Sequence, residues 1–433
     1  MTGFIKAHPI LTALTLLTIL GGGGLATAIL LWVYFREPLQ SLLADQFYFS
    51  ILLALALFGL IMGAVAYSIL LERKISAWVQ DRYGPNRVGP YGVLQPIADG
   101  VKFLLKEDVI PGNVDRTLFL LAPWLIFVVG LVGFAVIPWG GEFRWPWMDE
   151  GSKALVAQVA SVDIGLLYIL AVSSMSVYGV VLGGWASNNK YSFYGAMRAA
   201  AQMLSYEIPL GMAVLIAILA TGSVRLEHMV DYQLQHGWIV MYHPISALIL
   251  FVTALAEANR MPFDLAESEQ ELVGGYHTEY SAMKLAMFFL AEYAHMITSS
   301  AFIVCLYFGG AMIPGWDWLN TSTSAGAMLA RMAVLSGKVF LFICLYMIVR
   351  WTLPRFRFDQ LMRLAWKSLV PLTMGLVVVQ VLIIYFDASL WWALAANVGF
   401  LVVGAVFGTL SGSQITGRQH SLRRARGGVV AYR

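Results

Sequence analysis

The sequence has 433 residues, of which 59% are hydrophobic and 12% are charged, and its mean hydropathy is +0.73. Soluble domains carry about twice this share of charged residues, so the composition excludes an ordinary soluble protein. The net charge of +3 is too small to indicate a nucleic-acid partner, and we expect none.

The two cysteines, Cys305 and Cys344, lie in separate apolar segments. They lack the spacing of a zinc, haem or iron–sulfur site, and the histidines show no spacing typical of metal ligands. We therefore expect both cysteines to be structural and the chain to hold no metal of its own.

Long apolar segments recur along the whole chain. About 20 apolar residues cross the hydrocarbon core of a bilayer as a helix. Ten such segments predict an all-α, polytopic integral membrane protein with about ten transmembrane helices. The predicted ranges are 10–34, 47–71, 117–137, 155–183, 203–222, 242–258, 284–309, 332–350, 367–386 and 391–410.

The first of these segments, 10–34, has two features of a cleaved signal peptide. Four glycines at 21–24 weaken a helix, and Ala26-Thr27-Ala28 resembles a signal-peptidase site. The apolar residues nevertheless continue to Tyr34, beyond the usual apolar core of a signal peptide. The length favours an anchor that stays in the mature protein.

Lysines and arginines are divided unequally between the two sides of this topology. With the N-terminus in the cytoplasm, 22 of the 28 basic residues lie on the cytoplasmic side, 5 lie on the outer side and Lys338 lies within a span. Because cytoplasmic loops are enriched in Lys and Arg, this ratio predicts that both termini are cytoplasmic. The basic tail 411–433 is either bound to an anionic leaflet or solvated and disordered.

The predicted cytoplasmic loop 72–116 contains more than a simple connection. Its first part, 80–90, is rich in Gly and Pro, which mark turns. Apolar residues then recur at helical spacing, namely Leu94, Ile97, Val101, Leu104 and Leu105, with Asp99, Lys102 and Lys106 on the other side. This pattern predicts an amphipathic helix at the membrane interface, with an ordinary surface helix as the alternative.

Acidic residues are concentrated between residues 257 and 292. This stretch holds seven of the 25 acidic residues in the chain: Glu257, Asp264, Glu267, Glu269, Glu271, Glu279 and Glu292. Within the stretch only Arg260 and Lys284 balance them, and apolar spans flank it on both sides. Because carboxylates beside hydrocarbon are costly, we interpret the cluster as a path for protons or cations. A solvated acidic loop is the alternative.

The residues inside the acidic stretch predict its local structure. Pro262 stops or kinks the preceding helix, and Gly274-Gly275 allow a tight bend. Glu267 and Glu271 are four residues apart, so a helix would place them on one face. Because nearby like charges and burial both favour the protonated form, we expect the pKa of some of these carboxyls to be raised toward neutrality.

Three further ionisable residues lie inside predicted spans: Asp163, Glu207 and Lys338. Each is a functional hypothesis because charge inside a membrane is costly, with a position near the lipid boundary as the alternative. Together with the carboxylates at the two ends of the acidic stretch, Asp163 and Glu207 predict a polar file through the bundle. His277 and His295 are weaker candidates to support it.

Three parts of the sequence resemble one known family. They are residues 72–74 (ERK) with 82–100 (RYGPNRVGPYGVLQPIADG), residues 184–192 (GWASNNKYS) and residues 257–280 (EANRMPFDLAESEQELVGGYHTEY). They closely resemble the H subunit of bacterial proton-pumping NADH:quinone oxidoreductase, respiratory complex I. The resemblance divides the chain into an added span with a short outer loop (1–46), the family's membrane domain (47–410) and a basic cytoplasmic tail (411–433).

The resemblance implies roles for particular residues. It assigns Glu72, Arg73, Asp99 and Lys102 to a quinone tunnel. We assign proton coupling to Asp163, from the polar file, and to seven residues that the resemblance maps to an acidic funnel: Glu207, Glu257, Glu267, Glu269, Glu271, Glu279 and Glu292. Ser174 stands where some relatives have an acid, which implies a different connection in the upper funnel.

As a member of this family, the chain would be a subunit of the oxidoreductase and would not be catalytic alone. The resemblance implies ubiquinone or menaquinone as bound substrate, with flavin and iron–sulfur clusters confined to soluble partners. It also implies neighbouring small membrane subunits, lipid contacts and a place in the bacterial inner membrane. Two alternatives are the homologous membrane subunit of a hydrogenase-type complex and a stand-alone ion carrier.

Overall fold

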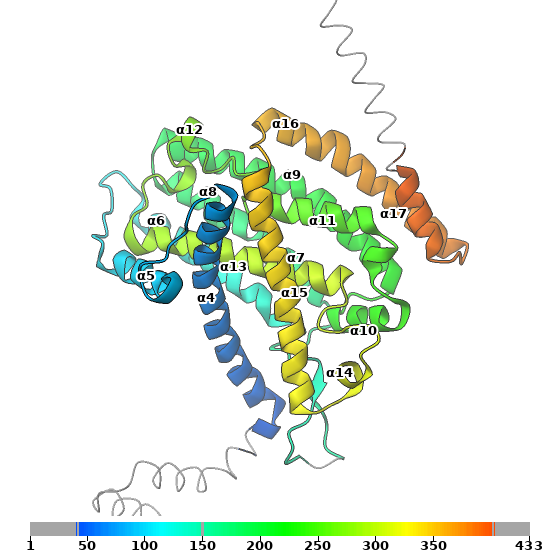
Figure 1. Cartoon of the computed structure of the whole chain (residues 1–433). Coiled ribbons are helices and arrows are strands. Elements are labelled where there is room, and N and C mark those ends of the chain that lie inside the picture. The colour runs from blue at the N-terminus through cyan, green and yellow to red at the C-terminus, as the bar shows by residue number, and fades with distance from the viewer. Residues whose placement is uncertain (1–39, 41–42, 149–150, 401, 403–433) are drawn as a thin grey trace, which may run out of the picture.

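The computed structural model describes residues 40, 43–148, 151–400 and 402, and this part of the chain is a bundle of long helices (Figure 1). The helices of ten or more residues are α4 (Gln46–Val79), α5 (Gln95–Leu105), α6 (Arg116–Val132), α7 (Gly165–Ser174), α8 (Ser176–Ala186), α9 (Lys190–Thr221), α10 (Leu226–His236), α11 (Pro244–Glu257), α13 (Ala282–Tyr307), α15 (Ala325–Thr352) and α17 (Val370–Tyr385).

Several shorter elements connect these helices. The short helical elements are η1 (Pro90–Gly92), η2 (Gly133–Val136), η3 (Ile239–Met241), α12 (Glu269–Leu272), η4 (Gly275–His277), α14 (Asp317–Thr321), α16 (Phe358–Arg363) and the π-helical η5 (Leu364–Leu369). The strands β1 (Glu142–Phe143) and β2 (Leu155–Val156) pair antiparallel, with Glu142 opposite Val156.

Seven helical stretches in the described part of the chain are long and apolar enough to cross a membrane: α4, α6 with η2, α7 with α8, α9, α13, α15, and α16 through α17. The apolar helix α11 is shorter, with 14 residues. These eight stretches correspond to eight of the ten predicted spans, and the all-α polytopic fold class is confirmed. The predicted span 10–34 lies outside the described residues, and 391–410 lies largely outside them.

Two predicted spans begin at the wrong residue. The span predicted from 155 starts as strand β2, and its helix begins only at Gly165. In between, the buried side chain of Gln158 donates to the carbonyl of Val136 at 2.7 Å, which favours an irregular backbone over a helix. The span predicted from 203 begins at Lys190, because the Asn189 side chain accepts a hydrogen bond from the first turn of α9 and caps it.

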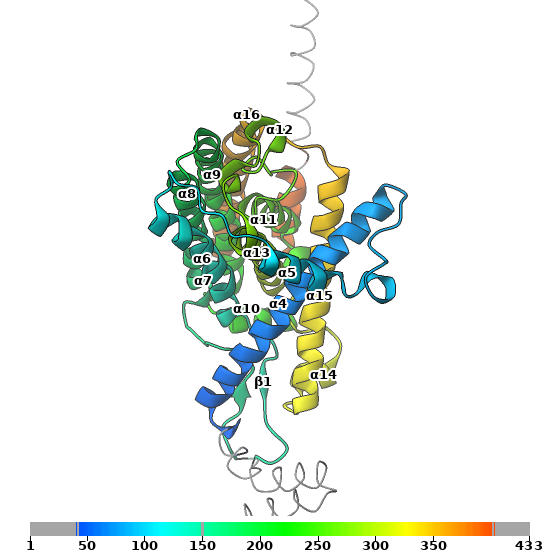
Figure 2. The ribbon, with the colours of Figure 1, turned by 90° about the vertical axis from the view of Figure 1, so that its left-hand side faces the viewer.

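Helix α13 lies at the centre of the bundle, with α4, α6, α11 and α15 packed around it (Figure 2). Small residues permit the close approach of α6. A side chain added at Gly130 would lie 3.4 Å from the carbonyl oxygen of Ala291, and the Thr298 hydroxyl donates to the Gly130 carbonyl at 3.2 Å. Close packing through small residues holds helices together where lipid surrounds them.

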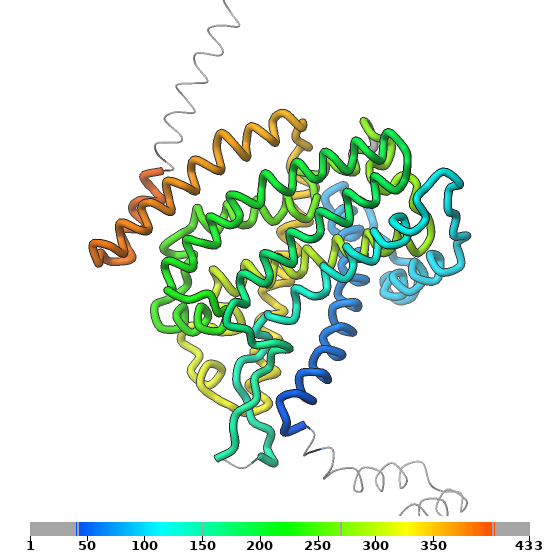
Figure 3. The backbone as a smooth tube through the Cα atoms, turned by 180° about the vertical axis from the view of Figure 1, so that it is seen from behind, coloured from blue at the N-terminus to red at the C-terminus, as the bar shows by residue number. Residues whose placement is uncertain are grey.

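On the face shown in Figure 3, α9 runs between its neighbours α8 and α11, and α17 packs against α9 from outside. Helix α5 lies at the edge of the bundle, against α4 and α13 (Figure 2). Its residues Ile97, Val101, Leu104 and Leu105 are exposed, so the predicted amphipathic helix is confirmed. Its position at a membrane interface stays a prediction.

The end of the bundle that lies away from α12 is closed by the β1–β2 hairpin, α10 and α14 (Figure 1). The buried Arg331 of α15 donates to the backbone carbonyls of Gly140, Glu142, Leu319, Asn320 and Ser322. Lys338, also on α15, donates to the carbonyls of Phe308, Gly310 and Met312 just beyond α13. A cation is favourable at a helix C-terminus, so Lys338 has a structural role there.

Candidate functional site

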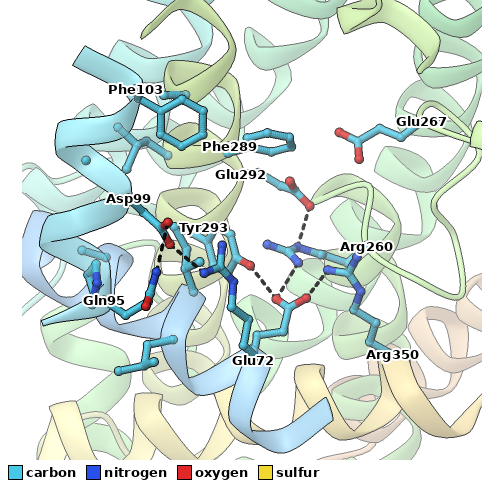
Figure 4. A pocket seen from close by; sticks show the side chains of 18 of the residues that line it. Glu72, Gln95, Asp99, Phe103, Arg260, Glu267, Phe289, Glu292, Tyr293 and Arg350 are labelled. Atoms are coloured by element: carbon cyan, nitrogen blue, oxygen red, sulfur yellow. Dashed lines mark hydrogen bonds and ion pairs between the residues drawn. The ribbon is translucent and has the colours of Figure 1, made fainter. Parts of the chain in front are cut away.

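A cavity of about 450 Å³ lies between α4, α5 and α13, and the loop after α11 and the end of α15 complete its wall (Figure 4). Its apolar lining residues are Ala66, Ile69, Leu70, Phe103, Leu104, Met261, Met283, Ala286, Phe289 and Leu290. Its charged lining residues are Glu72, Arg73, Asp99, Arg260, Asp264, Glu267, Glu292 and Arg350. Such a cavity suits a ligand with an apolar body and a polar head.

Four charged side chains on this cavity form what we call the Arg260 cluster: Glu72, Arg260, Glu292 and Arg350 (Figure 4). Arg260 Nη1 donates to Glu72 Oε2 at 2.9 Å, and Arg260 Nε lies 2.5 Å from Glu292 Oε1. Arg350 donates to the other oxygen of Glu72, and the Tyr293 hydroxyl donates to Glu72 Oε2 at 2.6 Å. Two positive and two negative charges thus meet from four separate segments.

Arg260 holds this cluster together from a buried position, with only 4% of its surface exposed. After α11 ends, Asn259 adopts a positive φ of 50°, which turns the chain immediately before Arg260. Burial acts to lower the pKa of the Arg260 guanidinium, but the charges of Glu292 and Glu72 outweigh burial and raise its pKa well above the usual value. The guanidinium also lies 4.0 Å from the centre of the Tyr293 ring.

A second group of charges lies where α5 meets α4. Asp99 accepts hydrogen bonds from Arg73 at 2.6 Å, from Lys102 at 3.2 Å and from Gln95 at 3.3 Å. Burial acts to raise the pKa of Asp99, but the hydrogen bonds and charges of Lys102 and Arg73 outweigh it and hold the pKa below its usual value. Arg73 and Asp99 line the cavity, whereas Lys102 does not and is 58% exposed.

Two carboxyls reach the cavity from the loop between α11 and α12. Asp264 pairs with Arg355 at 3.1 Å, yet burial raises the pKa of Asp264. The pKa of Glu267 is raised well above its usual value, first by burial and then by the charges of Glu292 and Asp264. Burial lowers the pKa of its neighbour His277, 3.5 Å away, to about 4, so that imidazole is neutral. The expected rise in carboxyl pKa is therefore confirmed at Glu267.

Two small cavities continue from Glu292 into the bundle. The inner cavity, of about 40 Å³, has among its lining residues Glu292, His295, Glu257, Tyr276 and Ser176. The deep cavity, of about 30 Å³, has among its lining residues Glu257, His295, Ser173, Thr298 and Ser299. His295 Nε2 lies 3.8 Å from Glu257 Oε1. Because neighbouring cavities share these residues, the three cavities follow one another in series.

Glu267 and Glu271 do not share one helical face, so that prediction is wrong. Glu267 precedes the four-residue helix α12 and lines the large cavity, whereas Glu271 pairs with Arg198 at 2.5 Å and is 53% exposed. The chain folds back at once, because Gly275 has a positive φ of 61° and any side chain there would lie 1.7 Å from the carbonyl oxygen of Ala266. Glu269 begins α12.

Three other predicted carboxylates lie outside the three cavities. Glu279 accepts a hydrogen bond from Asn189 at 2.6 Å, and Glu207 is exposed on α9. Asp163 is 87% exposed and pairs with Arg225 at 3.1 Å, in the loop before α7. The structure therefore brings Glu257 and Glu292 of the predicted polar file together, but it does not bring Asp163 to them.

Sequence reasoning did not anticipate Arg350 and Tyr293 in the cluster. Arg350 is 278 residues from Glu72 in the chain and resembles any cation at the end of a span, so no local signal distinguishes it. Tyr293 is different, because a hydroxyl next to Glu292 inside an apolar helix is a signal that points to a buried partner.

The described residues contain no group of three or more His, Cys, Asp or Glu side chains arranged to hold a metal ion. The prediction that the chain holds no metal of its own stays a prediction.

Comparison with known proteins gives a consistent result. The sequence matches the family described as NADH dehydrogenase over residues 52–381, a range that contains all three cavities. It is 46% identical over 317 residues to the first H subunit of NADH-quinone oxidoreductase from Cytophaga hutchinsonii, which covers 73% of this chain and 91% of that protein. It is 46% identical over 343 residues to the H subunit of the same enzyme from Leptospira biflexa, covering 78% and 94%. NADH-quinone oxidoreductase subunit 8 of Rhodothermus marinus is 44% identical over 340 residues, covering 76% and 96%.

Proposed function

Because this chain belongs to the NADH dehydrogenase family and is a multi-pass membrane subunit of an NADH-quinone oxidoreductase, we propose that it forms the membrane-facing wall of the quinone tunnel. We further propose that its buried carboxylates form an acidic path that couples quinone reduction to proton translocation. The names of the relatives favour this function over a hydrogenase-type complex or a stand-alone ion carrier.

The observation that carries the proposal is the composition of the large cavity. A quinone has a long apolar tail and a polar headgroup with two carbonyl oxygens. Apolar side chains such as Phe103, Phe289 and Leu290 suit the tail, and the Arg260 cluster lies on the same cavity, where polar groups suit a head. The amphipathic helix α5 forms part of this wall, so a lipid-soluble substrate has an apolar route past Leu104.

The chemistry of quinone reduction explains why carboxylates are needed nearby. Reduction to the quinol takes two electrons and two protons, and the electrons come from a partner subunit. Electron arrival places negative charge near Glu292 and Glu267, which favours protonation of both carboxyls. When the quinol forms and this charge disappears, the preference reverses. The alternating charge thereby biases proton movement along the acidic path and the conformations of coupled subunits.

The proposed setting follows from the distribution of charge. We propose that both termini and the acidic stretch 257–292 face the cytoplasm of a bacterium, where soluble subunits carrying flavin and iron–sulfur clusters would dock. Small membrane subunits and lipid would surround the remaining faces. Exposed Glu207 would need such a partner, because a carboxylate inside a membrane is costly when it faces lipid.

The tunnel is tested by narrowing its apolar wall with Ala66→Trp. Ala66 lines the cavity from α4, so we expect reduction of a long-tailed quinone to fall at least about tenfold. NADH oxidation by a water-soluble acceptor that bypasses the membrane arm should stay unchanged. Ala56→Trp, on an exposed part of the same helix, is the matched control. Equal quinone reduction in both variants would count against the tunnel.

The acidic path is tested by Glu292→Gln and Glu257→Gln in the assembled complex in liposomes. Each change keeps the side-chain shape but removes a titratable group, so we expect quinone-linked proton translocation to fall at least about tenfold. Wild-type rates of quinone reduction and translocation in both variants would show that these carboxyls are not essential carriers.

A further inference from the structure

We propose that His295, together with water in the inner and deep cavities, passes protons between Glu292 and Glu257. The inference rests on the proposed function, because it supplies one step within the acidic path. It assigns a task to a histidine that the sequence marked only as a weak candidate.

The first support is the position of His295 on α13. Glu292, His295 and Ser299 occupy positions i, i+3 and i+7 of this helix, so they lie along one face. The face spans about 10 Å at 1.5 Å per residue. His295 is the middle member, and its Nε2 lies 3.8 Å from Glu257 Oε1, which comes from the end of α11. The imidazole therefore stands between the two carboxyls.

The second support is a pair of buried polar atoms without partners. Among the described residues, neither His295 Nε2 nor Ser176 Oγ has a hydrogen-bond partner, and both residues line the inner cavity. Buried polar atoms are almost always hydrogen-bonded, to water where protein groups are lacking. The inner and deep cavities each have room for about two waters. The walls and the volume together indicate a hydrated connection.

The third support is the contrast in charge between the two carboxyls. Glu292 lies 2.5 Å from Arg260 Nε, whereas the described residues place only the His295 imidazole at ion-pair distance from Glu257. The inner cavity also presents the hydroxyl of Tyr276. Imidazole is the side chain whose ordinary pKa lies closest to physiological pH, so it exchanges protons readily in both directions. A relay at this point therefore has a titratable group suited to the task.

The proposed step moves one proton and no electrons. A proton leaves the Glu292 carboxyl, crosses water in the inner cavity and binds a ring nitrogen of His295. A proton then leaves His295 Nε2 and binds Glu257 Oε1, either directly or through one water. His295 returns to its starting state, Glu292 loses one proton and Glu257 gains one. The reverse sequence returns the proton.

The test uses the assembled complex in liposomes, with quinone reduction and proton translocation measured together. In His295→Gln, which keeps a polar side chain but cannot relay a proton near neutrality, we expect both rates to fall at least about tenfold. Electron transfer from NADH to a water-soluble acceptor should be unchanged, which reports intact assembly. His243→Gln is the matched control, because His243 is also buried but lies at the other end of α11 and lines none of the three cavities.

Rescue of His295→Ala separates a relay from a packing role. Added imidazole should restore quinone reduction and translocation, whereas pyrazole, with nearly the same shape but far weaker basicity, should not. Equal rescue by both compounds or by neither, or wild-type rates in His295→Gln, would overturn the inference. If Glu292→Gln and Glu257→Gln also keep wild-type rates, the acidic path itself fails. If they lose translocation while His295→Gln keeps it, only the relay fails.

Discussion

The Arg260 cluster and the Glu257–His295 pair are both buried in one helix bundle, but they compensate their carboxylates differently. In the cluster, Glu72 and Glu292 face two arginines whose charge does not change. In the pair, Glu257 faces one imidazole at 3.8 Å, beside water-sized cavities. Fixed cations suit a site that must keep its shape around a ligand. A titratable partner suits a site whose charge must change.

The largest expected effect comes from removing the fixed cation. Arg260→Met would leave two carboxylates buried without their central partner, so we expect a loss of about 3–5 kcal/mol in stability. Thermal unfolding and assembly of the purified complex measure it. Arg198→Met is the control, because the Arg198–Glu271 pair is partly exposed and contributes about 1 kcal/mol or less. Equal effects of the two changes would refute the special role of the cluster.

A double-mutant cycle compares the two regions directly. For Glu72→Gln with Arg350→Gln we expect a coupling energy of about 1–3 kcal/mol, because these charges touch and are buried. For Glu257→Gln with His295→Gln we expect about 0.5–1 kcal/mol in the same unfolding assay, because the groups lie farther apart. A larger coupling in the second pair would contradict the contrast.

Glu267→Gln tests the one cavity carboxyl whose only ion-pair contact in the described chain is a neutral histidine. Since folding raises the pKa of Glu267 above its ordinary value of 4.5, its contribution to stability is fully present below pH 4.5 and is lost as pH rises through the folded pKa. The variant should match wild type in acid and become more stable by about 1 kcal/mol as pH rises. Melting temperatures across a pH series measure this. A difference that does not grow with pH would be inconsistent with a raised pKa.

The smallest expected effect is that of Lys102→Ala. Lys102 is 58% exposed and lies outside the large cavity, and Asp99 keeps its shorter contact with Arg73. We expect a stability change of less than about 0.5 kcal/mol and quinone reduction within about twofold of wild type. A much larger loss of quinone reduction would mean that Lys102 meets the substrate or a partner, and it would extend the tunnel site beyond the cavity.

Much of the fold could be predicted because its signals are local. The apolar runs that became α4 and α15 have the length of a membrane span, and the spacing of Ile97, Val101 and Leu104 defines one face of α5. Errors occurred where a side chain changed the local outcome. Gln158 holds an irregular segment before α7, and Asn189 starts α9 early.

The candidate site was only partly predictable, since its charge balance comes from distant segments. The acidic stretch appeared to have Arg260 and Lys284 as its only cations. In the folded chain, Lys284 pairs instead with Asp108, and arginines from the end of α15 and beyond it approach Glu72 and Asp264. Helical spacing suggested that Glu267 and Glu271 act together, but a tight fold at Gly275 separates them.

From the sequence alone follow the membrane-spanning helices, the amphipathic helix and the excess of acidic residues beside apolar segments, because hydropathy and helical periodicity are properties of neighbouring residues. Which carboxylates meet an arginine, which meets an imidazole and which stay at the surface required the folded chain. Coulomb energy and desolvation depend on distances between side chains that lie tens to hundreds of residues apart, and only helix packing around α13 sets those distances.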